Sequence, residues 1–359
     1  MSGSTPVYAA LLRRQERWLH HLAVTDEVGE IVGTLCDRDL LPLQQYGAGS
    51  LTSEIAQAAV VEDVVRSCRR TAATVKALLD SGAHPRNVTR LVSSVCDAAT
   101  ERFVQLAVEE LGPPPARFAF VALGSQGRQE QTLVTDQDNA IIYVPPEPKA
   151  GAPDAAVYFQ ELGRRVCGWL NEAGYPFCRG RFMAQNPVWT RPLEAWKTHF
   201  SYWAMRAEPK ELLIFALFFD FRAVCGDAAV VEELRRHVFA ALRESPAFFP
   251  HFARDALNFK APVMLLGRIL IGGARNAPDT LDLKAATMPV VAFARLYALR
   301  HDIAQTGTLD RLDALAEGGW ITPASRDEIT VTYAVLTRLR LQRQVQCAHE
   351  GLAPDNLVE

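Results

Sequence analysis

The chain has 359 residues, a length that predicts two or three domains rather than one. Hydrophobic residues make up 49% of the sequence and charged residues 22%, which is typical of a globular protein with an ample core. The formal net charge is −3, which does not favour a general nucleic-acid binder, because such proteins usually carry an excess of basic residues.

Cysteine usage and the apolar runs indicate a cytoplasmic protein. Seven cysteines are scattered without a CxxC pair, and an odd count without metal-ligand spacing is typical of reduced thiols. No signal-peptide pattern precedes the first amphipathic segment. The longest apolar runs, residues 212–219 and 263–270, are far shorter than a membrane span, so we expect no membrane-embedded segment.

The N-terminal segment predicts a helix, two strands and a second helix. Helical spacing covers residues 6–22, the strands "LAVTD" (22–26) and "EIVGTLC" (30–36) flank a glycine turn, and Asp37 or Asp39 opens the second helix. This order resembles the later part of a CBS motif. CBS motifs work as pairs and the chain has room for only part of one, so a packing or dimerisation appendage is favoured over a sensor of adenosine ligands. A homodimer is expected from the resemblance alone.

The middle of the chain alternates between helical and extended patterns. Apolar spacing over residues 51–111 predicts two or three helices, broken near 81–87 by Gly, Pro and Asn. Buried strands are expected at 118–124 and 138–144, and a third strand ends the segment 211–227. The remaining predictions are helices at 155–174 and 191–205, an extended segment at 177–189, and helices from 228 to the end with loops at 244–250, 271–280 and 317–325.

The sequence "GSQGRQEQTLVTDQDNAIIY" combines a turn with a carboxylate pair. Gly124 lets the backbone approach a ligand closely, and Ser125 opens a short helix whose free N–H groups suit an anion. Arg128 can add positive charge for a phosphate. Asp136 and Asp138 begin the next predicted strand, where side-chain alternation puts both carboxylates on one face for a shared Mg²⁺. A phosphate turn and a metal-binding pair are parts that nucleotidyl transfer needs.

This motif resembles the nucleotidyltransferase superfamily that includes DNA polymerase β, and its longer form is similar to the catalytic domain of PII protein uridylyltransferases. The closest resemblance is to a bacterial family of proposed nucleotidyltransferases that carry CBS pairs upstream and a helical substrate-binding domain downstream. It covers roughly residues 55–355. The other segments that carry it are "FCRGRFMAQNPVW" (177–189), "FFDFRAVCGD" (218–227), "LDLKAATMPVV" (281–291), "TGTLDRLDAL" (306–315) and "RLRLQRQ" (338–344).

The resemblance implies a role for each matching position of the motif. Gly124 and Ser125 would hold the β- and γ-phosphates of a nucleoside triphosphate, with Arg128 assisting. Asp136 and Asp138 would bind Mg²⁺ or Mn²⁺. The implied reaction is attack of an acceptor hydroxyl on the α-phosphate of UTP or ATP, with pyrophosphate leaving between two metal ions.

Two later residues complete the implied site. The superfamily supplies a third carboxylate that binds metal and acts as general base, and Asp220 is the candidate for both roles. Lys284 stands near the start of a predicted helix, where it can face the cleft and touch phosphate or acceptor. The acceptor would be a protein, by resemblance a PII-like signalling protein, or a small molecule.

Structural interpretations compete with these roles. Asp220 can be a helix cap or the ion-pair partner of Arg222, and Arg128 can pair with Glu130 or Asp136. Lys284 is as well explained as a surface lysine. The basic stretch 338–344 is by default a solvated face and otherwise a wall of the cleft. Cys178 and Cys225 are best explained as small buried hydrophobes.

The predicted fold class is α+β, mostly α: a polymerase-β-like nucleotidyltransferase domain with a small mixed sheet and an all-helical C-terminal bundle. The predicted divisions are a partial CBS-like piece at 1–45, the nucleotidyltransferase domain with a helical lead-in at 46–228, and a substrate-binding bundle at 229–359. An alternative function is a non-catalytic module that binds a nucleotide and regulates through protein contacts. Transfer to an RNA end is disfavoured by the slightly acidic balance.

Overall fold

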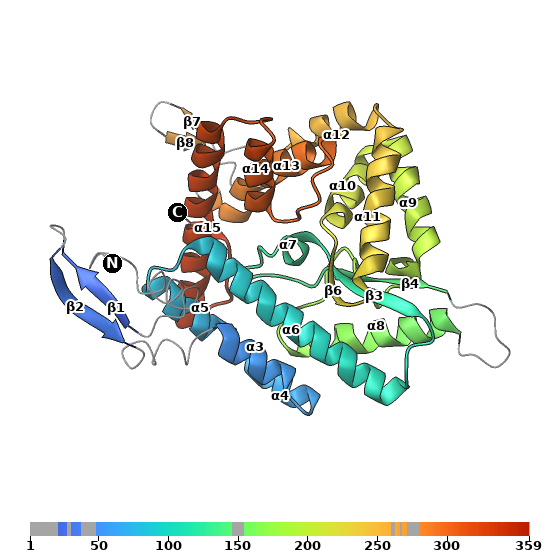
Figure 1. Ribbon diagram of the computed structural model, residues 1–359, viewed down its shortest axis with the longest axis horizontal. Coiled ribbons are helices and arrows are strands. Elements are labelled where there is room, and N and C mark those ends of the chain that lie inside the picture. Colours follow the sequence, from blue (N-terminus) through green and yellow to red (C-terminus); the bar gives the residue numbers. More distant parts are fainter. Residues whose placement is uncertain are drawn as a thin grey trace.

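The computed structural model describes residues 21–26, 30–36, 48–145, 154–259, 263–265, 268–270 and 280–358 (Figure 1). The predicted strand pair near the N-terminus is confirmed: β1 (His21–Thr25) and β2 (Ile31–Cys36) are antiparallel, with Leu22 opposite Leu35. The helices expected before and after this pair lie outside the described residues, apart from the end of the first, which belongs to β1. The CBS-like assignment therefore rests on the strand pair and stays a prediction.

Residues 48–111 form four helices where two or three were expected. They are α3 (Ala48–Ala56), α4 (Val61–Cys68), α5 (Thr71–Asp80) and α6 (Pro85–Leu111). The predicted break before Pro85 is confirmed: Pro85 occupies the first turn of α6, and the His84 ring caps the helix by accepting a hydrogen bond from the Arg86 N–H. The further breaks before α4 and α5 are too short to interrupt the apolar spacing, so the pattern does not reveal them.

A small mixed sheet follows, with strand order β5-β4-β3-β6. Its members are β3 (Arg117–Ala122), β4 (Asn139–Val144), β5 (Thr190–Pro192) and β6 (Arg222–Gly226). β3 is antiparallel to both β4 and β6, whereas β5 runs parallel to β4. The three predicted strands are thus present, and the fold is α+β with a predominance of helix, as expected.

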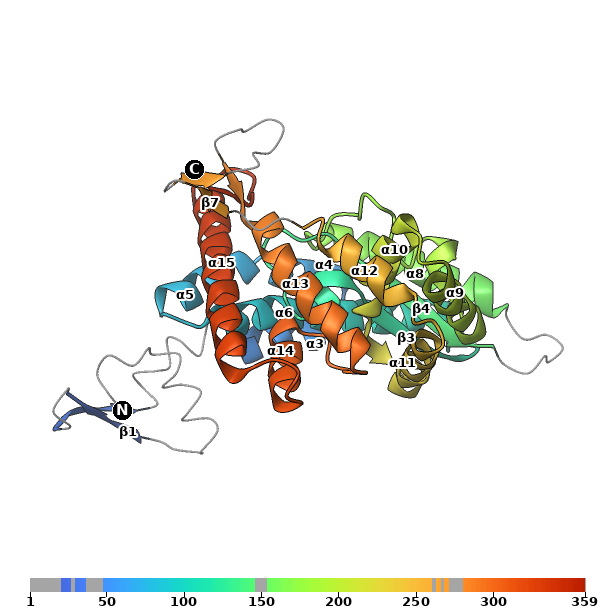
Figure 2. The same ribbon diagram turned by 90° about the horizontal axis from the view of Figure 1, so that it is seen from above.

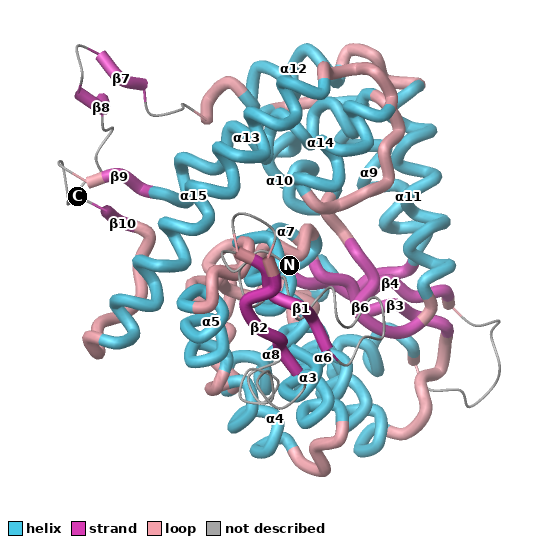
Figure 3. The backbone as a smooth tube through the Cα atoms, turned by 60° about the vertical axis from the view of Figure 1, so that its left-hand side comes forward, coloured by secondary structure: helices cyan, strands magenta, loops and turns pink. Residues whose placement is uncertain are grey.

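The sheet is the middle of three layers (Figures 1 and 3). Phe120 and Ile141 point into a core shared with α3, α4, α6 and the helix α8 (Ala155–Glu172). Their neighbours Val121 and Ile142 point to the other face, into a second core. The helices of that core are α9 (Leu193–Arg206), α10 (Pro209–Phe219), α11 (Ala228–Arg243) and α12 (Phe248–Ala256). Because side chains alternate along a strand, an uninterrupted apolar run is what a sheet covered on both faces requires.

The C-terminal part is helical, but the prediction of an all-helical bundle is wrong in two places. The helices are α13 (Leu283–Arg300), α14 (Thr308–Glu317) and α15 (Pro323–His349). Two small antiparallel pairs accompany them: β7 (Val263–Leu265) with β8 (Arg268–Leu270), and β9 (Leu281–Asp282) with β10 (Leu357–Val358). Short apolar runs such as "VMLLGRIL" fit a strand and a buried helix equally well, so periodicity cannot separate the two.

The last helices pack back onto the first ones. α15 lies against α5 and α6 as well as α13 and α14, which Figure 2 shows from above. The Gln344 side chain of α15 also fastens the loop before β4, because its Oε1 accepts from the Leu133 N–H at 2.9 Å and its Nε2 donates to the Thr132 hydroxyl at 3.1 Å. α14 is joined to α6 by ion pairs of Asp310 with Arg86 and Arg90. Within the described ranges no helix has both the length and the apolar character needed to cross a membrane.

Candidate active site

Gly124 lies where β3 gives way to the single helical turn α7 (Gly124–Gly127). Its φ of +53° is a backbone conformation that favours glycine. A Cβ atom at this position would lie 3.0 Å from Cδ1 of Leu217 and 3.1 Å from Oδ2 of Asp138. The missing side chain therefore allows the turn that carries Ser125 to approach the carboxylate of Asp138. The close approach of this backbone to a ligand stays a prediction.

Asp136 and Asp138 come just before β4 rather than inside it, because the strand begins at Asn139 and not at Asp136. Gln137 between them forms an isolated parallel bridge with Phe177. The Gln137 side chain turns inward, where its Nε2 donates to the carbonyls of Cys167 and Tyr175, each at 2.9 Å. This buried anchor leaves the two carboxylates on the opposite side of the segment, so the expected pairing of carboxylates holds although the strand starts later.

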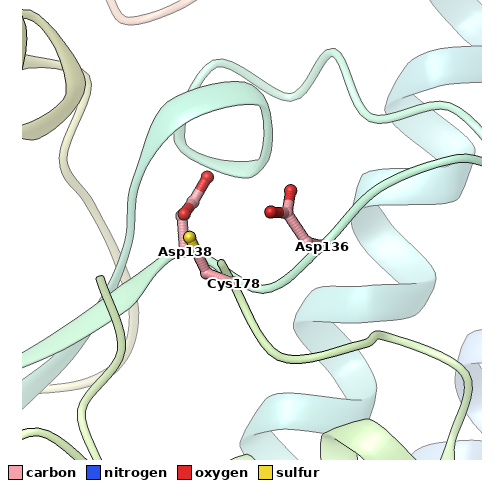
Figure 4. A group of neighbouring side chains, drawn as sticks. All are labelled: Asp136, Asp138 and Cys178. Carbon is pink, nitrogen blue, oxygen red and sulfur yellow. The ribbon is translucent and has the colours of Figure 1, made fainter. Parts of the chain in front are cut away.

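The structure adds Cys178 to this pair (Figure 4). One carboxylate oxygen each of Asp136 and Asp138 and the Cys178 sulfur all lie within 4.8 Å of one another. Cys178 is 8% exposed, and its interpretation as a small buried hydrophobe misses this placement. The available signal was its position in "FCRGRFMAQNPVW", one of the segments that carry the family resemblance.

The electrostatics of the cluster favour a cation. Burial and then the charge of Asp136 raise the pKa of Asp138 to about 6, while the Cys178 thiol, Lys284 and Arg128 lower it. Burial, followed by the charge of Asp138, raises the pKa of Cys178 to about 11. Two carboxylates held together at a partly buried place repel each other, so a divalent ion with oxygen ligands would relieve the cost. The two carboxylates of the cluster therefore fit the Mg²⁺ or Mn²⁺ that the resemblance implies.

The carboxylates face a cavity of about 200 Å³ between the sheet and the C-terminal helices. Gly124, Ser125 and the two aspartates form one side of it. Four cationic side chains also line it: Arg128, Lys284, Arg295 and Arg340. The structure therefore brings together at one cavity all the predicted site residues except Asp220.

Of the basic stretch 338–344, only Arg340 reaches this cavity. Its Nε donates to the Asn356 side-chain oxygen at 2.6 Å, and within the described residues no carboxylate forms an ion pair with it. Arg343 instead pairs with Asp355 at 2.9 Å, and Arg338 bonds the Ala83 carbonyl. The wall-of-the-cleft interpretation thus applies to one arginine of the stretch.

Apolar side chains also line the cavity. They are Leu213, Ala216 and Leu217 of α10 and Met288 and Val291 of α13. A cavity lined by both charged and apolar side chains suits a ligand that has both kinds of group, such as a nucleotide with its phosphates and base.

Asp220 lies elsewhere than the prediction requires. It is fully buried, and its carboxylate oxygens meet Arg128 at 2.6 Å, Arg295 at 2.6 Å and Arg311 at 2.8 Å. Burial by itself would raise its pKa, but the guanidinium charges outweigh burial and hold the pKa well below its usual range. It is outside the described group of candidate metal ligands, and a carboxylate with both oxygens engaged by arginines is a poor proton acceptor. This arrangement does not support the roles of metal ligand and general base.

Both structural alternatives for Asp220 hold in part. Asp220 is the C-cap residue of α10, and it is an ion-pair partner, but not of Arg222, which bonds Asp97 at 2.7 Å. Arg128 likewise combines both of its interpretations, since it pairs with Glu130 at 2.7 Å and with Asp220 while lining the cavity. Burial opposes the charge of Arg128, but the carboxylates of Asp220 and Glu130 outweigh it and raise the pKa.

Comparison with known families identifies two segments of the chain that line this cavity. Residues 69–210 match the family described as "Putative nucleotidyltransferase DUF294", and residues 246–359 match "Putative nucleotidyltransferase substrate binding domain". Residues 69–210 therefore belong to this nucleotidyltransferase family, and residues 246–359 belong to its substrate-binding domain. The first match contains the carboxylate pair and the Gly124 turn, and the second contains Lys284, Arg295 and Arg340.

Two curated relatives are similar to most of the chain. A bifunctional glutamine synthetase adenylyltransferase/adenylyl-removing enzyme from Nocardia farcinica is 26% identical over 275 residues, which cover 73% of this chain and 25% of the relative. The enzyme with the same name from Mesorhizobium japonicum is 26% identical over 334 residues, or 81% of this chain and 32% of the relative. The chain thus spans about a quarter to a third of the length of these enzymes.

Proposed function

We propose that the protein is a Mg²⁺-dependent nucleotidyltransferase that moves a nucleoside monophosphate from a nucleoside triphosphate to an acceptor hydroxyl. The observation that carries the proposal is the close approach of Gly124 to the carboxylate of Asp138, in a cavity that also holds Asp136 and four cationic side chains. Membership of a nucleotidyltransferase family supports the reaction class.

In this reaction the acceptor oxygen forms a bond to the α-phosphorus while the bond from that phosphorus to the bridging oxygen breaks. Pyrophosphate leaves, and the hydroxyl proton passes to solvent. Asp136 and Asp138 would hold the metal ion, which when bound neutralises phosphate charge and orients the reacting groups. Ser125 and the cationic side chains would bind the phosphates, and the apolar helix α10 would contact the base.

The donor is proposed to be ATP, with UTP as the alternative. The names of the two curated relatives support ATP, because both are adenylyltransferases. The resemblance of the central motif to PII protein uridylyltransferases supports UTP. The acceptor is proposed to be a tyrosine, serine or threonine of a cytoplasmic protein, by resemblance a PII-like signalling protein, or a small molecule.

A second candidate function is a nucleotide-binding regulatory module without catalysis. The burial of Asp220 among arginines favours it, because the candidate ligand group in the described part of the chain then holds two carboxylates and no third. Such a module would bind a nucleotide in the same cavity but transfer nothing.

Calorimetric titration of each nucleoside triphosphate, with and without Mg²⁺, tests the proposal. We expect one triphosphate to bind the wild type only with Mg²⁺, and the double variant Asp136→Asn/Asp138→Asn to keep its fold and lose this binding. Unchanged triphosphate binding by the double variant would mean that the two carboxylates are not part of the binding site. If a triphosphate binds with Mg²⁺ but a labelled form of it transfers no label to any acceptor in a lysate, the regulatory module would be favoured.

A further inference from the structure

The segment that carries Cys178 is fastened to the carboxylate pair on both sides. The Gln137 N–H donates to the Pro176 carbonyl at 3.1 Å, before Cys178 in the chain. The Asn139 N–H donates to the Phe182 carbonyl at 3.0 Å, after it. Since Gln137 and Asn139 flank Asp138, these bonds hold the sulfur next to that carboxylate.

A third set of contacts fixes the orientation of the Cys178 backbone. Its N–H donates to the sulfur of Met183 at 3.3 Å. The Asn139 side-chain oxygen accepts from the Ala184 N–H at 2.8 Å, so the segment is anchored again just beyond Met183. The result is visible in Figure 4, where the Cys178 sulfur lies beside Asp138 and the Asp136 carboxylate turns toward them.

We propose that the sulfur of Cys178 is a third metal ligand beside Asp136 and Asp138 when the site holds a Zn²⁺-class ion, whereas Mg²⁺ is held by the two carboxylates alone. The proposal rests on the proposed function only in using the same carboxylates. Mg²⁺ takes oxygen ligands, whereas thiolate ligands select softer ions such as Zn²⁺. Three protein ligands with a remaining position open to a cavity are also the arrangement of catalytic zinc sites.

The binding step balances without a further reactant. The ion exchanges bound water for two carboxylate oxygens and the sulfur, and the thiol proton is released to solvent. Asp136 and Asp138 line the cavity, so a phosphate oxygen or water there could complete the coordination of a bound ion. With Mg²⁺ the same carboxylates would serve without the sulfur, so the identity of the ion decides whether Cys178 participates.

Titration of the full-length, metal-free protein with Co²⁺ tests whether the sulfur binds. Co²⁺ is a spectroscopic substitute for Zn²⁺, and a sulfur ligand gives it a charge-transfer absorption band in the near ultraviolet. We expect this band in the wild type and in the control variant Cys225→Ser, whose thiol lies on β6, and we expect no band in Cys178→Ser. A wild-type Co²⁺ complex without the band, or a band retained in Cys178→Ser, would overturn the proposal.

Competition dialysis with Zn²⁺ and Mg²⁺ supplies the second measurement. Loss of a partner that merely supports a metal ligand lowers affinity about 10–100-fold, so loss of the sulfur itself should lower Zn²⁺ affinity by about tenfold or more. Mg²⁺ affinity should change by less than about twofold, because sulfur is a poor ligand for it. Equal loss of both ions would mean that the serine variant has only damaged the segment, and it would overturn the proposal.

The proposed function and the metal-site proposal can be contradicted by different results. Mg²⁺-dependent binding of a triphosphate should persist in Cys178→Ser, because Asp136 and Asp138 remain. If the wild type shows the sulfur band but binds no triphosphate, the metal site stands and the nucleotidyl transfer does not.

Discussion

The carboxylate of Asp220 lies 2.8 Å from the guanidinium of Arg311, and neither side chain is exposed to solvent. Arg311 belongs to α14, and Asp220 precedes β6 in the sheet. Arg295 of α13 and Arg128 bond the same carboxylate. One buried anion therefore holds three cations, two of which line the cavity. We expect Asp220 to be a positioning residue for this cationic side.

Asp220→Asn should lower the free energy of unfolding by about 3–5 kcal/mol at neutral pH, because it leaves buried arginines without their anion. The pKa of Asp220 is depressed in the fold, so this contribution is present above the unfolded pKa of about 4 and is lost as pH falls below it. Urea unfolding at two pH values would measure the effect.

Asp227→Asn is the matched control for that variant. Asp227 follows β6, pairs with the exposed Arg117 at 2.7 Å and caps α11, and asparagine caps a helix as well as aspartate does. A change below about 1 kcal/mol is expected. If Asp220→Asn were as stable as this control but unable to transfer a nucleotide, Asp220 would be the general base after all.

Gly124→Ala should weaken metal binding more than it weakens the fold. The new Cβ would meet the Asp138 carboxylate at 3.1 Å and would hold alanine at a positive φ. Displacement of Asp138 should raise the dissociation constant for Mn²⁺ by about tenfold, measured by calorimetry. Gly168→Ala in α8 is the control, because its Cβ meets nothing within 4 Å and alanine favours a helix. Equal metal affinity in the two variants would contradict the role given to Gly124.

Asp138→Asn should stabilise the metal-free protein at pH 8 by about 1–3 kcal/mol while removing metal binding. The pKa of Asp138 is raised to about 6 by burial and by Asp136. Its charged form is therefore costly in the fold above pH 6, and the cost disappears below the unfolded pKa. Denaturant unfolding with a chelator present should show a stability gain at pH 8 that shrinks by pH 5. A loss of stability at pH 8 would mean that the carboxylate is satisfied without a cation.

Arg340→Gln should weaken triphosphate binding by about tenfold, because Arg340 lines the cavity, has no carboxylate partner among the described residues and remains charged at neutral pH. Burial lowers the pKa of Arg340 to about 10, which still leaves it protonated. Arg343→Gln is the control on the same helix, since Arg343 already pairs with Asp355. Calorimetry with ATP and with adenosine would separate a phosphate contact, which affects only ATP, from a general change of the cavity.

The sequence was sufficient where a residue's role depends on its neighbours in the chain. Gly124, Ser125, Asp136 and Asp138 lie within one short motif. A turn after one predicted strand and the start of the next strand were enough to place these residues together. The buried strands around them were predicted because uninterrupted apolar runs are typical of a sheet that is covered on both faces.

The sequence was insufficient where the role of a residue depends on residues far apart in the chain. The position of Asp220 is set by Arg295 and Arg311, which lie 75 and 91 positions later in the chain. The apolar spacing of their helices does not indicate that these two side chains are directed toward Asp220. Cys178 was overlooked for a similar reason: a buried thiol and a metal ligand have the same local pattern, and only the bonds from Gln137 and Asn139 to its segment bring it to Asp138.

The sharing of Asp220 also makes the two halves of the chain dependent on each other. A cut between β6 and α11 would leave Asp220 with Arg128 in one fragment and would leave Arg295 and Arg311 without their shared anion in the other. Neither fragment should persist alone, and the intact chain should unfold in a single cooperative transition through this region. The segment with the carboxylate pair and the segment that follows β6 would then fold and unfold as one unit.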